Sequence, residues 1–126
     1  MQKNTTNLKV WADAIDLAVI VFDEVTRFPE KGSSLAQQMI RSAISVPSNI
    51  AEGKGRLSDR ESRQFMGIAR GSLLELQSQV IIAGRVNLLD PGVVKLTLDR
   101  INEVGRELNG LIRFYSNAIE QESRKR

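Results

Sequence analysis

Apolar residues recur every three or four positions through almost the whole chain of 126 residues, and no stretch alternates apolar with polar residues as a half-buried strand would. This spacing matches the 3.6-residue turn of an α-helix, so each segment presents an apolar stripe along one side. Glycine- and proline-containing segments at 28–34, 53–57 and 88–92 interrupt the pattern. The sequence therefore predicts an all-α fold, an up-down-up-down four-helix bundle with short loops.

The first two helical segments are separated by the loop at 28–34. The first has its apolar stripe at Leu8, Trp11, Ile15, Ala18, Phe22 and Val25. The second has an apolar row at Leu35, Met39, Ala43, Val46 and Ile50, with Pro47 inside it. Because proline lacks a backbone donor, we expect this helix to be kinked near Pro47 and to run to about Glu52. A break at Val46 is the alternative, and Gly53 and Gly55 are expected to cap and turn the chain.

The third and fourth helices have clear start signals. Ser58 and Glu61 form an S-x-x-E capping box, which predicts a helix from there to about Leu89. Asp90 followed by Pro91 predicts the start of the last helix, which should end near Ile119. We therefore expect a single domain over residues 8–119, with flexible ends at 1–7 and 120–126.

The third helix has more apolar surface than one bundle core needs. Beside a stripe at Phe65, Ala69, Ser72, Leu76, Val80 and Ala83, a second one follows at Leu74, Ile81 and Leu88. Exposing the second stripe to water costs roughly 25 cal/mol per Å² of apolar area. We predict that self-association buries Leu74, Ile81 and Leu88, whereas the simpler alternative is a bundle that wraps further around this helix.

The composition restricts the chemistry. The chain has no cysteine and no histidine, which removes the commonest metal ligands, nucleophile and general base. We expect no metal, no cofactor and no enzymatic activity. No stretch approaches the roughly 20 apolar residues of a membrane span, and the start of the chain does not resemble a signal peptide, so a cytoplasmic protein is expected.

Basic residues concentrate around the turn between the second and third helices. Residues 41–70 contain six basic and three acidic side chains, a net charge of +3 that equals the excess of the whole chain. The free backbone donors of a helix N-terminus also favour phosphate. We predict a nucleic-acid-binding corner formed by Arg41, Lys54, Arg56, Arg60, Arg63 and Arg70. The alternative is a solvated corner in which these side chains pair with Glu52, Asp59 and Glu61.

Three polar residues near this corner have structural interpretations. After Pro47, Asn49 is expected to bond the Ala43 carbonyl that the proline leaves free, and Glu52 to pair with a nearby arginine. Glu75 is expected to reach Arg41 or Arg70 across a helix interface. A functional alternative makes Asn49 and Glu52 a buried pair that grips a ligand or a neighbouring subunit.

Three long segments resemble a known family. LKVWADAIDLAVIVFDEVTRFP, LAQQMIRSAISVPSNIAEGKGR and FMGIARGSLLELQSQVIIAG are similar to the four-helix-bundle proteins called 23S rRNA-intervening sequence proteins. The resemblance extends from about Leu8 to Tyr115, and it includes Pro47, Asn49, Glu52, Gly53 and Glu75. That family is bacterial and similar to the accessory variability protein of diversity-generating retroelements.

The resemblance implies a homopentamer, contact with RNA or DNA, and a reverse transcriptase or other protein as a further partner. Together with the basic corner, it leads us to expect a non-enzymatic homo-oligomeric adaptor that binds RNA or DNA. The alternative is a protein-binding scaffold that does not bind nucleic acid.

Overall fold

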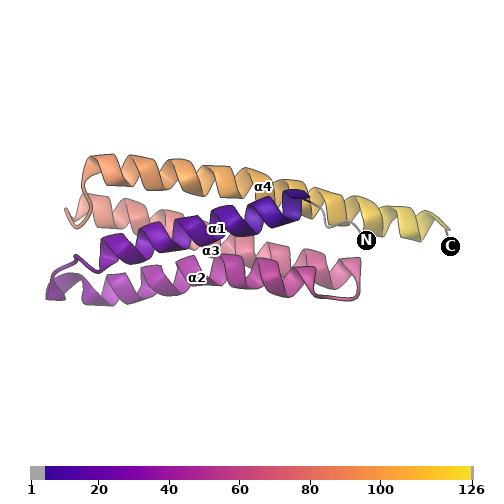
Figure 1. The fold of residues 1–126 in the computed structure, drawn as a ribbon, viewed down its shortest axis with the longest axis horizontal. Coiled ribbons are helices and arrows are strands. Elements are labelled where there is room, and N and C mark those ends of the chain that lie inside the picture. The colour runs from indigo at the N-terminus through magenta and orange to yellow at the C-terminus, as the bar shows by residue number, and fades with distance from the viewer. Residues whose placement is uncertain (1–4, 126) are drawn as a thin grey trace.

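The structure, a computed structural model, describes the backbone of residues 5–125 and the side chains of residues 9–125. Its elements are α1 (Thr5–Val25), the short 3-10 helix η1 (Glu30–Gly32), α2 (Ser33–Lys54), α3 (Asp59–Arg85) and α4 (Pro91–Lys125). No strand occurs within residues 5–125. The helices lie side by side, and each returns alongside the one before it (Figure 1). The predicted all-α four-helix bundle is confirmed.

The helices pack around one apolar core in a four-sided arrangement. α1 and α3 each lie against α2 and α4, whereas no Cα atoms of the diagonal pairs come within 8 Å of each other in the described part of the chain. The largest fully buried side chains include Leu17, Met39, Ile50, Met66, Leu76, Leu108 and Leu111. Because of this arrangement, the outer face formed by α1 and α2 is opposite the one formed by α3 and α4.

α1 buries a different face from the predicted one. The core receives Val10, Ala14, Leu17, Val21 and Val25. The predicted stripe is borne out only in part: Val25 is in the core and Ala18 packs against it, whereas Trp11 and Phe22 remain 37% and 52% exposed. The predicted position of Leu8 lies outside the described side chains. The reason is that α1 has two apolar faces one residue apart, and packing against α2 and α4 determines which of them is buried.

α2 continues through Pro47, so a break at Val46 is wrong, while the kink stays a prediction. The helix extends to Lys54, and Gly55 follows it as the C-cap residue. Gly53 is therefore a residue of the helix and not its cap, contrary to expectation. It is buried where α2 meets the start of α3, and its carbonyl accepts a 2.8 Å hydrogen bond from Ser62 Oγ. The missing side chain at Gly53 lets the two helices approach closely.

α3 begins as predicted, because Ser58 Oγ accepts a 3.2 Å hydrogen bond from the Glu61 backbone N–H. It ends at Arg85, before the predicted position near Leu89. Asn87 adopts a left-handed conformation with φ 64°, and Leu88 N–H then bonds the Ala83 carbonyl at 2.8 Å. This is the Schellman pattern, for which asparagine is suited. Leu88 thus lies beyond the helix, half-buried against Gly32, and does not share a face with Leu74 and Ile81.

α4 starts at Pro91, as predicted, but it continues to Lys125, six residues beyond the predicted end at Ile119. Residues 120–125, predicted as a flexible end, are helical and solvent-exposed. Of the other predicted end, residues 5–7 are helical in α1. Residues 1–4 and 126 lie outside the described residues. None of the described helices is both long and apolar enough to cross a membrane.

Candidate nucleic-acid interface

The basic residues predicted to form one corner are distributed over several surfaces. Arg56, on the turn itself, pairs with Glu52 one helical turn earlier, so Glu52 has the arginine partner expected of it. The Arg56 guanidinium also lies 4.6 Å from the centre of the Phe65 ring, a cation–π contact. Because a carboxylate neutralises this guanidinium and an aromatic ring covers one of its faces, Arg56 is a poor centre for a phosphate site.

Two arginines of α3 point towards α4. Arg63 Nη1 donates a 3.2 Å hydrogen bond to Ser116 Oγ, and Arg70 Nε donates a 3.0 Å hydrogen bond to Asn109 Oδ1. Both acceptors are neutral, so these contacts hold the guanidinium groups in place without cancelling their charge. No carboxylate of the described residues forms an ion pair with either arginine.

Of the remaining basic candidates, Arg60 and Arg41 each border a shallow hollow, and Lys54 is the last residue of α2. Arg60 borders a hollow of about 340 Å³ between the start of α3 and the end of α4, which Glu122 also lines. Arg41 borders a polar hollow of about 380 Å³ between α2 and α3, together with Glu75 and Gln79. Lys54 is half-buried as the last residue of α2. The six residues therefore do not form a single patch within one protomer.

A polar network joins α2 to α3 beside the second hollow. Asn49 Nδ2 donates to the Ser45 carbonyl at 2.8 Å and to Ser45 Oγ at 3.0 Å, and Ser45 Oγ lies 2.8 Å from Ser72 Oγ. The prediction that Asn49 bonds the Ala43 carbonyl is wrong. An α-helical side chain lies over the turn before it, and the turn before Asn49 brings it to Ser45. Glu75 lies in the same hollow as Arg41 but forms no ion pair within the described residues.

The apolar residues predicted for self-association differ in exposure. Leu74 is 47% and Ile81 38% exposed on the face that α3 forms with α4. Ile81 lines a hollow of about 570 Å³ with the apolar Val94 and Leu98, and the polar side chains of Arg85, Lys95, Asp99 and Asn102 also line it. The same strip of α3 therefore changes along its length, from basic at Arg63 and Arg70 to apolar at Leu74 and Ile81. We call these the basic half and the apolar half of the α3–α4 face.

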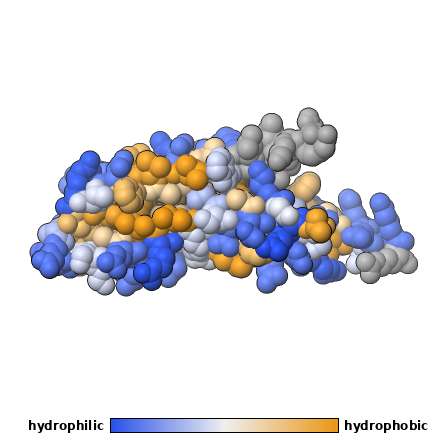
Figure 2. All heavy atoms as spheres, turned by 60° about the horizontal axis from the view of Figure 1, so that its bottom comes forward, coloured by the Kyte–Doolittle hydropathy of each residue, from blue (hydrophilic) through white to orange (hydrophobic). Residues whose placement is uncertain are grey.

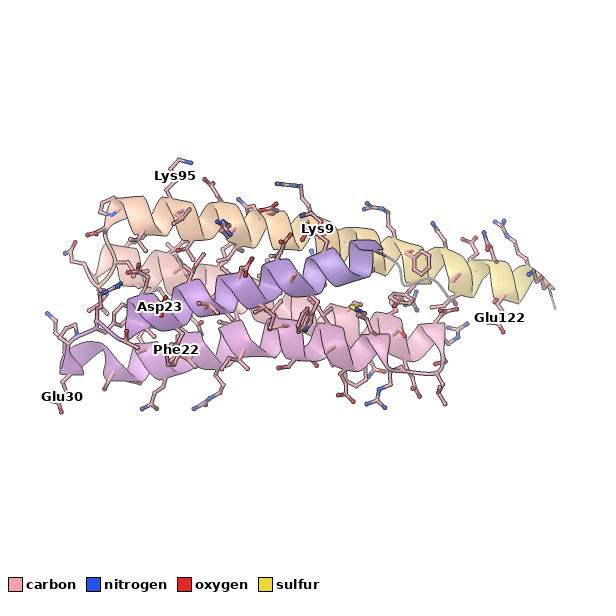
Figure 3. All side chains as sticks on the ribbon, in the orientation of Figure 1. Lys9, Phe22, Asp23, Glu30, Lys95 and Glu122 are labelled. Atoms are coloured by element: carbon pink, nitrogen blue, oxygen red, sulfur yellow. The ribbon has the colours of Figure 1, made fainter. Side chains whose placement is uncertain are left out.

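A second apolar surface lies on the opposite, α1–α2 face. It is a groove of about 440 Å³, whose lining is almost entirely apolar: Trp11, Ile15, Ala18, Val19, Phe22, Ile44, Pro47, Ser48 and Ala51. Figure 2 shows apolar atoms gathered along part of this face, and Figure 3 places Phe22 between the two helices. Sequence reasoning found Trp11, Ile15, Ala18 and Phe22 of this groove but assigned them to the core.

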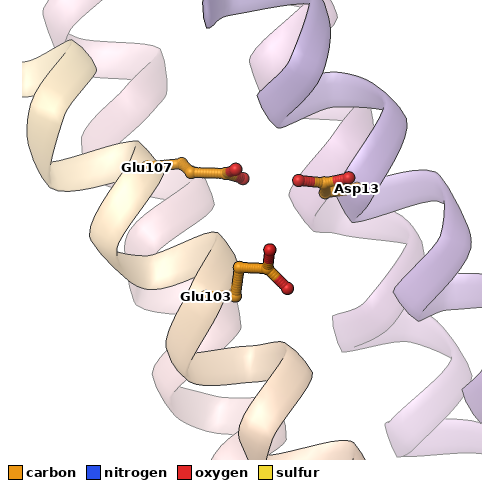
Figure 4. A group of neighbouring side chains, drawn as sticks. All are labelled: Asp13, Glu103 and Glu107. Atoms are coloured by element: carbon orange, nitrogen blue, oxygen red, sulfur yellow. The ribbon is translucent and has the colours of Figure 1, made fainter.

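Three carboxylates and one ammonium group meet between α1 and α4. The carboxylates of Asp13, Glu103 and Glu107 lie within 4.8 Å of one another (Figure 4). Lys9 Nζ lies 2.7 Å from both Asp13 and Glu107 and 3.9 Å from Glu103 (Figure 3). The ammonium group thus occupies the position that a bound cation would need, and the cluster is an ion-pair network across two helices.

The ion-pair network shifts the pKa values of Lys9, Asp13 and Glu107 in different directions. Hydrogen bonds to Asp13 and Glu107 raise the pKa of Lys9 above its usual range. Burial opposes ionisation of Asp13, but the hydrogen bonds with Lys9 and Glu107 and the charges of Lys9 and Arg100 together outweigh it, so the pKa of Asp13 is lowered. Burial raises the pKa of Glu107, because it outweighs the effect of Lys9. Neighbouring carboxylates that share one cation behave in this way.

These features define a small helical-bundle protein with apolar surfaces on two opposite faces and arginines along one of them. The chain belongs to the 23S rRNA-intervening sequence protein family, whose model matches residues 6–110.

Comparison with solved structures agrees with the fold. The chain is similar to the crystal structure of a protein of unknown function from the S23 ribosomal protein family of Bacteroides thetaiotaomicron, with a TM-score of 0.81. The two share 16% sequence identity over 86% of this chain and 98% of the other, so the likeness concerns the fold alone. No curated protein matches the sequence.

Proposed function

We propose that this protein is a non-enzymatic, homo-oligomeric adaptor of the bacterial cytoplasm that binds the phosphate backbone of RNA or DNA. The observation that carries the proposal is the state of Arg63 and Arg70. Both are fixed by neutral hydrogen-bond acceptors on α4 and keep their charge available. Arginine binds phosphate well because its planar fork of donors matches the phosphate oxygens.

The two apolar surfaces support self-association. The α1–α2 groove and the apolar half of the α3–α4 face differ in volume and in lining residues, and they lie on opposite sides of the bundle. Two different complementary surfaces suit head-to-tail contacts, which close into a ring when the rotation between neighbours allows it. A ring of five subunits, as the family resemblance implied, is one such assembly. Each subunit of a ring would add its own arginines, so weak phosphate contacts would combine through multivalency.

The binding proposal is tested by fluorescence anisotropy of the purified protein with a labelled structured RNA and a labelled DNA duplex. Affinity in the micromolar range or tighter that falls steeply between about 50 and 200 mM salt is the expected result. No binding at the lowest salt would refute nucleic-acid binding.

The assembly proposal is tested by sedimentation of wild type and of Leu74→Glu with Ile81→Glu. Each new carboxylate would have to be buried in the interface, so the variant should sediment as a folded monomer while wild type forms an oligomer. A monomeric wild type would refute self-association.

A protein-binding scaffold without nucleic-acid binding is the second candidate, and the apolar α1–α2 groove favours it. This function predicts an intact oligomer that shows no affinity for either probe. If α3 arginines serve as intersubunit contacts, Arg63→Glu with Arg70→Glu should split the oligomer. The adaptor function predicts that the same change removes nucleic-acid binding and leaves the oligomer intact.

A further inference from the structure

The strip of α4 that faces Arg63 and Arg70 carries two more arginines. Asn109 and Ser116 accept the hydrogen bonds from α3, so they mark the side of α4 that faces α3. Arg106 is three residues before Asn109, and Arg113 is three residues before Ser116. Residues three or four apart lie on one side of a helix, so Arg106 and Arg113 belong to the same strip.

The four arginines alternate between the two antiparallel helices. With a rise of about 1.5 Å per residue, Arg113 lies about 4.5 Å along the bundle axis from the level of Arg63. Arg70 follows at about 10.5 Å and Arg106 at about 15 Å. The backbone positions from which the four arginine side chains extend therefore follow one another about every 5 Å along the α3–α4 face.

Within the described part of the chain, no carboxylate forms an ion pair with any of the four arginines. The hydrogen-bond acceptors along the strip, Asn109 and Ser116, are neutral. Gly67 and Gly71 of α3 lie next to the strip and have open space above them. The carboxylates of α4 nearest to Arg106 along the chain, those of Glu103 and Glu107, pair with Lys9 of α1 instead.

We propose that Arg63, Arg70, Arg106 and Arg113 form a track for one strand of nucleic acid, bound through consecutive phosphates along the basic half of the α3–α4 face. A strand carries one charge per roughly 3.4 Å of duplex axis, so a line of about 15 Å meets about four phosphates. The track specifies where the nucleic-acid binding proposed above takes place, and it rests on that function. It also moves the site away from the α2–α3 turn and onto α4, where no binding residue was predicted.

The track contains no aromatic platform. Phe114 is half exposed on α4 next to Arg113, but its ring already forms an edge-to-face contact with Tyr115, at a centroid distance of 5.2 Å. Grooves that bind single strands add aromatic rings, on which the bases stack, to their positive charge. Because the track lacks such a ring, binding should depend on the nucleic-acid backbone and show little base preference.

The test uses the full chain and a short fluorescein-labelled oligouridylate. Four phosphate contacts predict a slope of log affinity against log salt of about −3 for a single strand, or about −4 for a duplex. Arg106→Gln with Arg113→Gln should reduce the slope by about 1.5 and weaken binding at least tenfold at about 50 mM salt. The matched control is Arg27→Gln with Lys31→Gln, which removes the same charge at the α1–α2 turn and should change affinity less than threefold.

The outcomes separate this site from the proposed function. If wild type does not bind the oligouridylate or a DNA duplex, the function itself fails. If wild type binds but the Arg106 and Arg113 variant matches the control, the track is wrong and the function stands. A variant that no longer forms the wild-type oligomer would make these arginines assembly contacts and overturn the track. Equal affinity for polyglutamate would overturn its assignment to nucleic acid.

Discussion

Gly53 and Gly67 are both helical glycines, yet replacing them with alanine should have opposite effects on stability. A methyl group built on Gly53 would lie 2.9 Å from Met66 Cε and 3.0 Å from Phe65 Cβ. It would also lie 3.2 Å from the Ser62 carbonyl oxygen. The same group on Gly67 would meet nothing within 4 Å. Neither glycine has a positive φ, so alanine causes no backbone strain at either site.

The magnitudes follow from two terms. Alanine in place of glycine within a helix gains up to about 1 kcal/mol from helix propensity. Overpacking a closely packed contact costs about 1–3 kcal/mol, and the Phe65 Cβ and the backbone oxygen cannot move as freely as the end of Met66. Gly67→Ala should therefore raise the free energy of unfolding by somewhat less than 1 kcal/mol. Gly53→Ala should lower it by about 1 kcal/mol, which separates the variants by about 2 kcal/mol.

Urea unfolding followed by circular dichroism measures this difference, with all proteins at one concentration because oligomers are stabilised by mass action. The melting temperatures should differ by about 8 °C, at about 4 °C per kcal/mol for a chain of this size. If Gly53→Ala proves as stable as Gly67→Ala, the close approach of α2 and α3 at Gly53 does not limit the packing there, and the reasoning is refuted.

Three other substitutions test buried polar contacts by urea unfolding. Ser62→Ala removes the hydrogen bond to the Gly53 carbonyl and should cost about 1–2 kcal/mol; no change would mean that this carbonyl finds another donor. Asn49→Asp should destabilise more than Asn49→Ala, because a carboxylate cannot donate to the Ser45 carbonyl and is repelled by it; the reverse order would contradict the network. Because burial raises the pKa of Glu107 above 4.5, its contribution is complete below pH 4.5 and declines as pH rises through the folded-state value. Glu107→Gln should remove that decline, and an unchanged pH profile would show that Glu107 titrates normally.

The fold could be predicted largely because its signals are local. The helical spacing, the Ser58 capping box and Pro91 each act within one or two turns of chain, and the structure has the helices where these signals place them. The early end of α3 is also local, since Asn87 adopts the left-handed conformation that asparagine tolerates. That signal was present in the sequence and was not used.

The rotation of each helix could not be predicted in the same way. α1 has apolar residues on two adjacent faces, and spacing alone does not say whether Val21 or Phe22 is buried. The position of the candidate site depends in the same way on how α3 and α4 are rotated about their axes. The sequence shows Arg63 and Arg70 seven residues apart, but only the rotation of α3 against α4 shows that both reach that helix, at Ser116 and Asn109. Charge counted along the chain instead emphasised the α2–α3 turn, where Glu52 neutralises Arg56.

α4 is 35 residues long, against 27 for α3, which corresponds to about 52 and 40 Å of helix. Figure 1 shows its C-terminal turns projecting past the other helices, and residues 120–125 are exposed. Since the chain contains no cysteine, Arg124→Cys would introduce a unique thiol on this projection, away from the core, the groove and the apolar half of the α3–α4 face. A single fluorophore attached there gives every subunit one reporter. The number of photobleaching steps in one particle would then count the subunits, and energy transfer between the reporters would distinguish a closed ring from an open filament.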